Sequence, residues 1–150
     1  MLYMVEPEVA GGWGEGTVAD TTVHPPAVSA LEYRLDGWLG DDILEAFPCY
    51  IVTESLMKDF AQKKLVGYED ADVMLTVSEN FFSDYDISDI PKFRWLKIIG
   101  SDPGSDFRYS ADNRLIVSEK AMAVLKKHKI SHADIETFQQ NHGWRGAGSW

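Results

Sequence analysis

One segment of the chain occurs twice. Residues 50–65, YIVTESLMKDFAQKKL, match residues 115–130, LIVSEKAMAVLKKHKI, at an offset of 65. The identical pairs are Ile51 and Ile116, Val52 and Val117, Glu54 and Glu119, Met57 and Met122, and Lys64 and Lys129. Both copies are expected to adopt the same local structure. The repeat therefore predicts a chain built from one structural unit used twice.

The shared positions are those that build a strand followed by a helix. In each copy a β-branched run ends at a hydroxyl residue, Thr53 or Ser118, that is suited to cap a helix. A glutamate follows, where the positive end of the helix dipole favours it, and apolar residues then recur at helical spacing. We expect strands at 49–52 and 114–117, helices at 54–64 and 119–128, and returning strands at 72–77 and 132–138.

Local patterns predict the remaining elements. Apolar spacing favours strands at 1–5, 31–35 and 93–99, a short helix at 40–47 and a single helical turn at 78–82. The sequence GGWGEG is too rich in glycine to hold a regular element, and the polar segment 83–91 is typical of an exposed loop. Together these elements predict an α+β fold, mixed α/β, in which two similar strand-helix-strand units share a mixed sheet.

The length of the chain predicts a single domain, 1–150, with one core, because a chain of this size buries roughly two-thirds of its unfolded surface. Residues 1–30, rich in glycine and proline, are expected to form an N-terminal arm packed on that domain, and 139–150 a mobile C-terminal tail. The chain lacks a signal-peptide pattern and any run of roughly 20 apolar residues, which favours a cytoplasmic protein without a membrane partner. The single cysteine, Cys49, excludes an internal disulfide and is expected to be buried.

Charge is divided unevenly along the chain. The net charge is −10, but residues 1–91 hold 4 basic and 18 acidic residues, whereas residues 92–150 hold 10 basic and 6 acidic ones. No basic residue lies between Lys64 and Lys92. Such a field repels nucleic acid and anionic membranes and attracts a basic partner.

The sequence contains only weak patterns for metal binding, catalysis or phosphate binding. His128 and His132 have the i, i+4 spacing of a helical metal pair, but the helix should end before them and no third ligand is nearby. His132 and Asp134 can share a strand face, for which a structural pair is the simpler interpretation. Ser118 is better explained as a helix cap than as a nucleophile, and GGWGEG lacks the strand, helix and lysine of a phosphate-binding loop. We therefore expect no enzymatic activity, no metal and no cofactor.

A partner-binding surface is the remaining candidate for a functional site. Aromatic side chains lie among carboxylates in the segment that follows the first repeat, combining apolar anchors with charge that steers a basic protein. The alternative is that these aromatic residues belong to the core and the carboxylates are only solvated. The predicted binding residues are Glu69, Asp70, Asp72, Glu79, Phe81, Phe82, Asp84, Tyr85, Asp86 and Asp89.

Several stretches of the chain also resemble one kind of bacterial protein. They are EPEVAGGWGE, TTVHPPAV, LDGWLGDDILEAFPCYIVTE, IPKFRWLKIIG and DNRLIVSEKAMAVLKKHKI, which together extend over most of residues 6–138. They are similar to immunity proteins of the kind encoded beside polymorphic or contact-dependent toxins. The resemblance implies a non-enzymatic protein that binds a cognate toxin domain in the cytoplasm and blocks it. It implies no particular binding residue, so the surface above is predicted from its carboxylates and aromatic residues and not from the resemblance.

Two other functions remain open from the sequence. One is a small metal-dependent enzyme that uses His128, His132 and Asp134. The other is a general protein-interaction module, a monomer or a homodimer formed through an exposed sheet edge.

Overall fold

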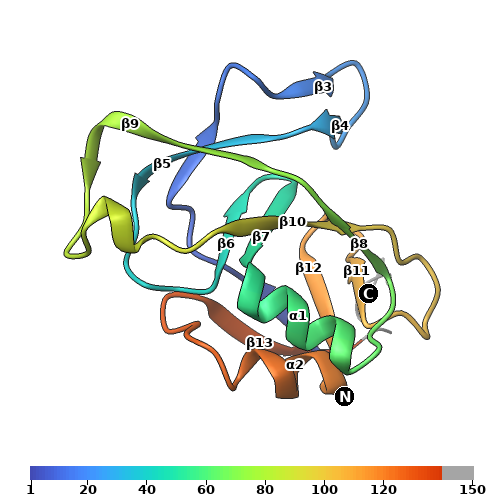
Figure 1. The fold of residues 1–150 in the computed structure, drawn as a ribbon. Helices are drawn as coiled ribbons and strands as arrows, with labels where there is room; N and C mark the ends of the chain where they lie inside the picture. The colour runs from blue at the N-terminus through green and yellow to red at the C-terminus, as the bar shows by residue number, and fades with distance from the viewer. Residues whose placement is uncertain (140–150) are drawn as a thin grey trace.

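The computed structural model describes residues 1–139 (Figure 1). Except for Gln139, the predicted mobile tail lies outside this range. The elements are β1 (Leu2–Glu6), β2 (Gly11–Trp13), β3 (Val18–Asp20), β4 (Ala27–Ala30), β5 (Glu32–Gly37), β6 (Ile43–Ala46), β7 (Cys49–Thr53), α1 (Glu54–Gln62), β8 (Tyr68–Ala71), β9 (Met74–Phe82), the 3-10 helix η1 (Ile87–Asp89), β10 (Phe93–Ile98), β11 (Phe107–Tyr109), β12 (Leu115–Ser118), α2 (Glu119–Leu125) and β13 (Asp134–Phe138).

The predicted α+β class is wrong, because strands dominate the fold. Strands hold 45% of the structure and helices only 14%, and the sheets are mainly antiparallel. The difference comes from short strands that have no strong local pattern and are stabilised by pairing with a neighbouring strand. The clearest are β2, β3, β6 and β11. The protein is therefore predominantly β.

Two four-stranded sheets have the same topology. The first sheet has the order β6-β7-β10-β8 and the second the order β11-β12-β1-β13. Each begins with an antiparallel hairpin, continues through a helix and returns in a strand parallel to the second hairpin strand. An antiparallel strand lies between these two parallel strands: β10 in the first sheet and β1 in the second. The sequence repeat therefore corresponds to a repeated fold unit, completed in the second case by the N-terminal strand.

Asp42 joins the two units from the start of the first hairpin. Its backbone N–H donates to the C=O of Lys129 at 2.7 Å, and its Oδ2 accepts from the N–H of Lys129 at 2.9 Å. Its C=O and Oδ1 accept from the N–H and hydroxyl of Thr53, at 3.0 and 3.1 Å. Asp42 thus joins Thr53, the N-cap residue of α1 in its own unit, to the loop that follows α2 in the other unit.

Asp106 makes the same four bonds from the second unit to the first. Its N–H donates to the C=O of Val66 at 2.9 Å, and its Oδ2 accepts from the N–H of Val66 at 2.8 Å. Its C=O and Oδ1 accept from the N–H and hydroxyl of Ser118, at 2.9 and 2.6 Å. The two units therefore hold each other by reciprocal contacts, each aspartate binding the loop after the partner unit's helix.

Both helices begin at the predicted caps. The hydroxyl of Thr53 accepts from the N–H of Leu56, and that of Ser118 from the N–H of Ala121, at 3.3 and 3.0 Å. The predicted apolar faces are buried, since Met57 and Met122 and their helical neighbours lie in the core. Helix α1 ends two residues before the predicted boundary and α2 three residues before it.

The apolar interior has two parts, whereas the length of the chain predicted one core. The first cluster lies between the two four-stranded sheets and both helices, and Tyr50 and Val52 of β7 point into it. The second lies on the opposite face of the first sheet, where Ile51 and Trp95 meet β5. Alternate residues of β7 thus face different clusters, as strand geometry requires. The first sheet is the layer shared by both.

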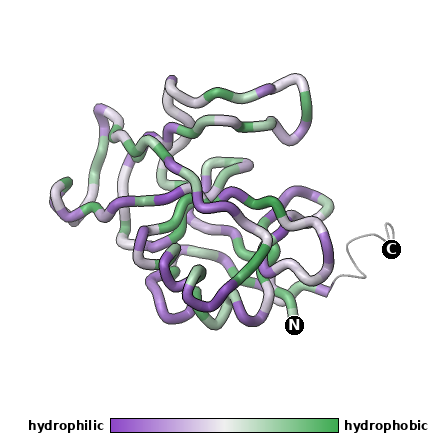
Figure 2. The backbone as a smooth tube through the Cα atoms, turned by 45° about the vertical axis from the view of Figure 1, so that its right-hand side comes forward, coloured by the Kyte–Doolittle hydropathy of each residue, from purple (hydrophilic) through white to green (hydrophobic). Residues whose placement is uncertain are grey.

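Residues 1–30 only partly match the predicted arm. Strand β1 lies inside the second sheet and β2 pairs with β5, so both belong to the body of the fold. The hairpin of β3 and β4 is different, because it pairs only with itself and extends away from the other strands (Figure 1 and Figure 2). Only this hairpin, with the turn that joins its strands, has the position of an arm.

Three local predictions are wrong for related reasons. The predicted helix at 40–47 is strand β6, which pairs with β7 as a hairpin. The predicted helical turn at 78–82 is the second half of β9. The glycine-rich segment contains β2, because a Cβ at Gly11 would lie 1.9 Å from the C=O of Arg34, and only glycine allows that approach. In each case a partner strand decides the conformation.

Candidate partner-binding surface

The predicted binding residues come from two edge strands and the loop that follows them. Strand β8 is the outer strand of the first sheet, and β9 is the outer strand of the three-stranded sheet β2-β5-β9. All seven carboxylates of residues 69–89, which we call the acidic segment, are exposed. Strand β9 and the loop with η1 run along one side of the molecule (Figure 1). The structure thus places the acidic segment on an open margin of two sheets.

Two of these carboxylates are already paired. Arg94 of β10 binds Asp70 through Nε at 2.6 Å and Asp72 through Nη1 at 2.5 Å. The hydrogen bonds that Arg94 donates to Asp70 and Asp72 raise the pKa of Arg94, so the guanidinium stays charged. No ion pair within residues 1–139 involves the other five carboxylates: Glu69, Glu79, Asp84, Asp86 and Asp89.

The three aromatic residues of the prediction have different surroundings. Phe81 is half-buried and packs against the second apolar cluster. Tyr85 lies with its ring centroid 4.8 Å from that of Trp38, which fixes the loop after β9 to the body of the protein. Phe82 has 75% of its surface exposed. Of the three, Phe82 has the exposure expected of an apolar anchor, and Phe81 and Tyr85 also have structural roles.

A groove of about 630 Å³ borders the acidic segment between β9 and β10. Buried Leu35 and Phe93 lie at its base, and Val73, Leu75 and Val77 form one wall. The opposite wall comes from Ile87, Ile90 and Pro91, and the charged residues Glu54, Lys92 and Arg94 border it. Sequence reasoning missed this groove, although the alternation of Val73, Leu75 and Val77 was a signal for a one-sided apolar strand.

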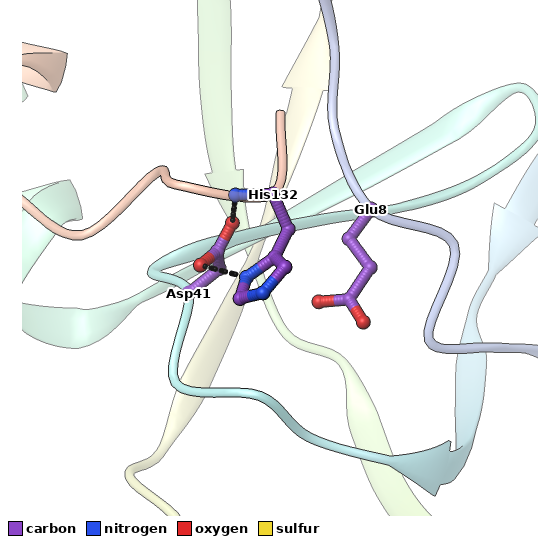
Figure 3. A group of neighbouring side chains, drawn as sticks. All are labelled: Glu8, Asp41 and His132. Atoms are coloured by element: carbon purple, nitrogen blue, oxygen red, sulfur yellow. Dashed lines mark hydrogen bonds and ion pairs between the residues drawn. The ribbon is translucent and has the colours of Figure 1, made fainter. Parts of the chain in front are cut away.

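A second candidate site contains Glu8, Asp41 and His132, whose ligand atoms lie within 4.8 Å of one another (Figure 3). Buried Asp41 accepts from Nδ1 of His132 at 2.9 Å and from its backbone N–H at 2.9 Å. The hydrogen bond to Asp41 raises the pKa of His132. Burial raises the pKa of Glu8.

The geometry of this cluster favours a structural role. The hydroxyl of Ser131 also donates to Asp41, so the carboxylate is surrounded by donors of the loop after α2 and holds that loop in place. Among residues 1–139, no other group of three metal-ligating side chains lies this close together. Only Glu8 and the second ring nitrogen of His132 remain as ligands, too few for a typical protein metal site.

The histidines of the alternative enzyme hypothesis are not brought together. His128 binds Asp59 through Nε2 at 2.7 Å and lies 3.3 Å from Asp42 through Nδ1, while His132 binds Asp41. Asp134 is exposed on β13 and makes no ion pair with either histidine among the described residues. Each histidine therefore fastens a loop to a neighbouring aspartate.

Cys49 is not a candidate nucleophile. It lies in the second apolar cluster, and burial raises the pKa of its thiol to about 12. A thiol with such a pKa is almost fully protonated at neutral pH and reacts slowly. The sequence prediction of a buried cysteine is confirmed.

Neither a scan against protein-family models nor a search of curated proteins found a match to this chain. The resemblance to immunity proteins therefore stays a prediction from the sequence. Neither of the helices in residues 1–139 has the length and apolar character required to cross a bilayer.

Proposed function

We propose that this protein is a non-enzymatic inhibitor that binds and neutralises a basic bacterial toxin domain in the cytoplasm. The observation that carries the proposal is the coincidence of unpaired carboxylates, an outer strand and exposed apolar side chains in the acidic segment. Protein interfaces combine such apolar anchors with charges that steer the encounter.

Charge supports a basic partner over other ligands. The acidic segment holds seven carboxylates and no basic residue, and within residues 1–139 only Asp70 and Asp72 form an ion pair with a cation. The resulting negative field raises the association rate of a basic protein and opposes binding of nucleic acid. A basic toxin domain whose own ligand is a nucleic acid is complementary to such a surface.

The polar clusters support binding without catalysis. Asp41, Asp42 and Asp106 all accept hydrogen bonds from the backbone of neighbouring loops. The histidines that could act as general bases are paired with aspartates that hold the same loops. These side chains are explained by the stability of the fold, which leaves the exposed acidic segment as the surface available for function.

The test compares two variants with the same change in charge. The first carries Asp84→Asn, Asp86→Asn and Asp89→Asn, and the control carries Glu15→Gln, Asp134→Asn and Glu136→Gln, all exposed and outside the acidic segment. Each is co-expressed with the toxin gene expected beside this one, and affinity for the purified toxin domain is measured at low and high salt. We expect the first variant to lose about tenfold in affinity at low salt, since exposed ion pairs contribute modestly, and the control to lose little.

Two results would contradict the proposal. Equal neutralisation and equal low-salt affinity of both folded variants would show that the acidic segment is not the binding surface. A gene neighbourhood without a toxin reading frame would remove the partner itself.

A further inference from the structure

Strand β9 offers an unpaired edge beside the groove. It is the last strand of its sheet, parallel to β5, and no other strand of residues 1–139 pairs with its outer side. Met74 and Phe82 are 58% and 75% exposed along it. Natural proteins usually protect such edges with lysine, proline or a covering loop. Strand β9 contains neither lysine nor proline.

The polar backbone groups of the edge point outward at two positions. The N–H of Met74 donates to the C=O of Leu31, next to β5, at 3.0 Å. Successive strand residues direct their N–H and C=O to opposite sides, so Thr76 also faces β5, whereas Leu75 and Val77 face the open side. Outside the strand ladders, no backbone hydrogen bond within residues 1–139 reaches Leu75 or Val77, and the one strand of these residues that pairs with β9 is β5, on the other side.

Side-chain contacts hold this part of β9 in a fixed position. The hydroxyl of Thr76 donates to Oε2 of buried Glu32 at 2.8 Å, on the neighbouring strand β5. Leu75 and Val77 line the groove together with Val73. The edge is therefore a preformed template, with two free hydrogen-bonding residues above an apolar groove.

Charge indicates what can occupy this template. Asp72 precedes β9, Glu79 lies within it, and Asp84 follows it, all exposed. Of the charged residues that border the groove, Arg94 is already paired with Asp70 and Asp72, and Lys92 has Glu54 of opposite charge on the same border. A second copy of β9 pairing at the same edge would bring two acidic segments together, and their mutual repulsion opposes dimer formation. A segment with lysine or arginine would instead find complementary charge.

We propose that the edge of β9 is the docking strand for an extended, basic segment of the partner protein. The segment adds a strand beside Leu75 and Val77 and places alternate apolar side chains in the groove, while the negative field of the acidic segment attracts its basic residues. Backbone bonds then supply affinity and the groove selects apolar side chains at every second position. This inference rests on the proposed function and specifies its mode of binding.

The experiment uses the full chain and a labelled peptide of alternating lysine and valine. The controls are a peptide of the same composition with its lysines and valines in two blocks, and a peptide of alternating glutamate and valine. Hydrogen exchange followed by NMR reports on single amides. We expect the alternating basic peptide to slow the exchange of the Leu75 and Val77 amides, with Met74 and Thr76 slow throughout, and both control peptides to bind more weakly.

Two substitutions test the edge directly. Val77→Pro removes an N–H that is not part of the ladder to β5, so the fold should persist while peptide affinity falls about tenfold. Val77→Arg keeps the backbone but places a cation at the groove, and Val18→Arg, an exposed position on β3, is its charge-matched control. Both Val77 variants should weaken peptide binding, and Val18→Arg should leave it nearly unchanged.

The outcomes separate this inference from the proposed function. Peptide binding that leaves the Leu75 and Val77 amides unprotected, a doubled solution mass in place of peptide binding, or full toxin affinity in folded Val77→Pro would overturn docking on β9. Toxin affinity that depends on Asp84, Asp86 and Asp89 would still support the proposed inhibitor in that case. Protection of the β9 amides by peptide, with a toxin indifferent to those carboxylates, would support the docking strand and contradict the acidic toxin-binding surface.

Discussion

At the scale of single residues, the reciprocal aspartates have the most demanding environment. The side chain of Asp106 accepts from the N–H of Val66 and the hydroxyl of Ser118, and Asp106 is buried. Asp42 has the same bonds but a more exposed side chain, with 20% of its surface accessible. The two sites share the same four bonds but differ in burial and in the ring of His128, whose Nδ1 lies 3.3 Å from Asp42.

Asp106→Asn is expected to lower the free energy of unfolding by about 1–3 kcal/mol, because an amide NH₂ would face one of two donors. Asp42→Asn should cost less, since water can reach that site. Urea unfolding of both variants measures the difference, with Asp134→Asn on exposed β13 as the control. If Asp106→Asn were as stable as the control, the bonds between the units would contribute nothing to the fold.

His132 should make stability depend on pH. Its hydrogen bond to Asp41 is the main cause of a raised pKa, and the charges of Asp41 and Glu8 add to it. Because the folded pKa lies above the unfolded value near 6.5, the stabilisation is complete below about pH 6.5 and is lost as pH rises through the folded pKa. The histidine therefore stabilises the loop after α2 mainly in mildly acidic solution.

His132→Asn keeps a neutral donor near Asp41 and removes the titration. The unfolding free energy of the wild type should exceed that of the variant by more at about pH 5.5 than at about pH 8.5. The charge of His132 also lowers the pKa of Glu8, so the substitution changes both titrations and the pH dependence reports on the coupled groups. A difference that did not change with pH, measured by urea unfolding, would mean that His132 is not charged by this pair.

At the scale of elements, the glycine-rich segment shows how tertiary contacts determine local structure. A Cβ on Gly11 would lie 1.9 Å from the C=O of Arg34, but one on Gly12 would meet nothing within 4 Å. The two residues are neighbours in β2, but only Gly11 lies against the backbone of β5. Gly11→Ala should therefore destabilise the protein by roughly 1–3 kcal/mol through overpacking against β5.

Gly12→Ala is the matched control and should be close to neutral or slightly stabilising, because alanine restricts the unfolded chain. Thermal unfolding by circular dichroism is sufficient to compare them. The contact between β2 and β5 would have to be looser than described if both alanine variants melted at the same temperature.

The elements that could be predicted from sequence are those with a local cause. Helices α1 and α2 combine a capping hydroxyl with apolar residues at helical spacing, and both signals lie within one segment. Strand β6 has no such signal, since four mostly apolar residues fit a helix or a strand equally well until β7 pairs with them. The predicted fold class is wrong for the same reason. Most of the elements that local patterns do not predict are short strands.

The candidate site also combines features that the sequence predicts with features that depend on the fold. That the carboxylates of the acidic segment are exposed follows from the high cost of burying charge, and composition alone predicts it. The groove could not be predicted, because it brings together Leu35, Leu75 and Phe93 from three separate strands. The pairing of Arg94 with Asp70 and Asp72 also depends on the placement of β8 next to β10.

At the scale of the whole molecule, the two units have the same sheet topology but their strands follow a different order along the chain. The first unit has all its strands in one stretch from β6 to β10, but the second takes its middle strand, β1, from the other end of the chain. Leu2 pairs with Phe138 in the register of β1 and β13, so these positions lie side by side. Joining the ends would therefore convert the fold into two complete units in tandem.

This relation predicts that a circular permutant will fold. A flexible linker of glycine and serine joins β13 to Met1, and the new termini lie at Asp102 in the exposed turn between β10 and β11. The permutant should keep the circular dichroism spectrum and most of the stability, since no strand or helix is cut and exposed loops tolerate new termini. A second permutant, opened between Lys64 and Leu65, is the control, because its termini lie beside the bonds of Val66 to Asp106.

The control should unfold at a lower urea concentration than the first permutant, because loss of a fixed position for Val66 frees one side of the reciprocal contact. The reverse order of stability would mean that β1 must lead the chain for the second sheet to form. In that case the shared topology would not make the units interchangeable, and the reciprocal aspartates would only supplement a fold determined by its N-terminal strand.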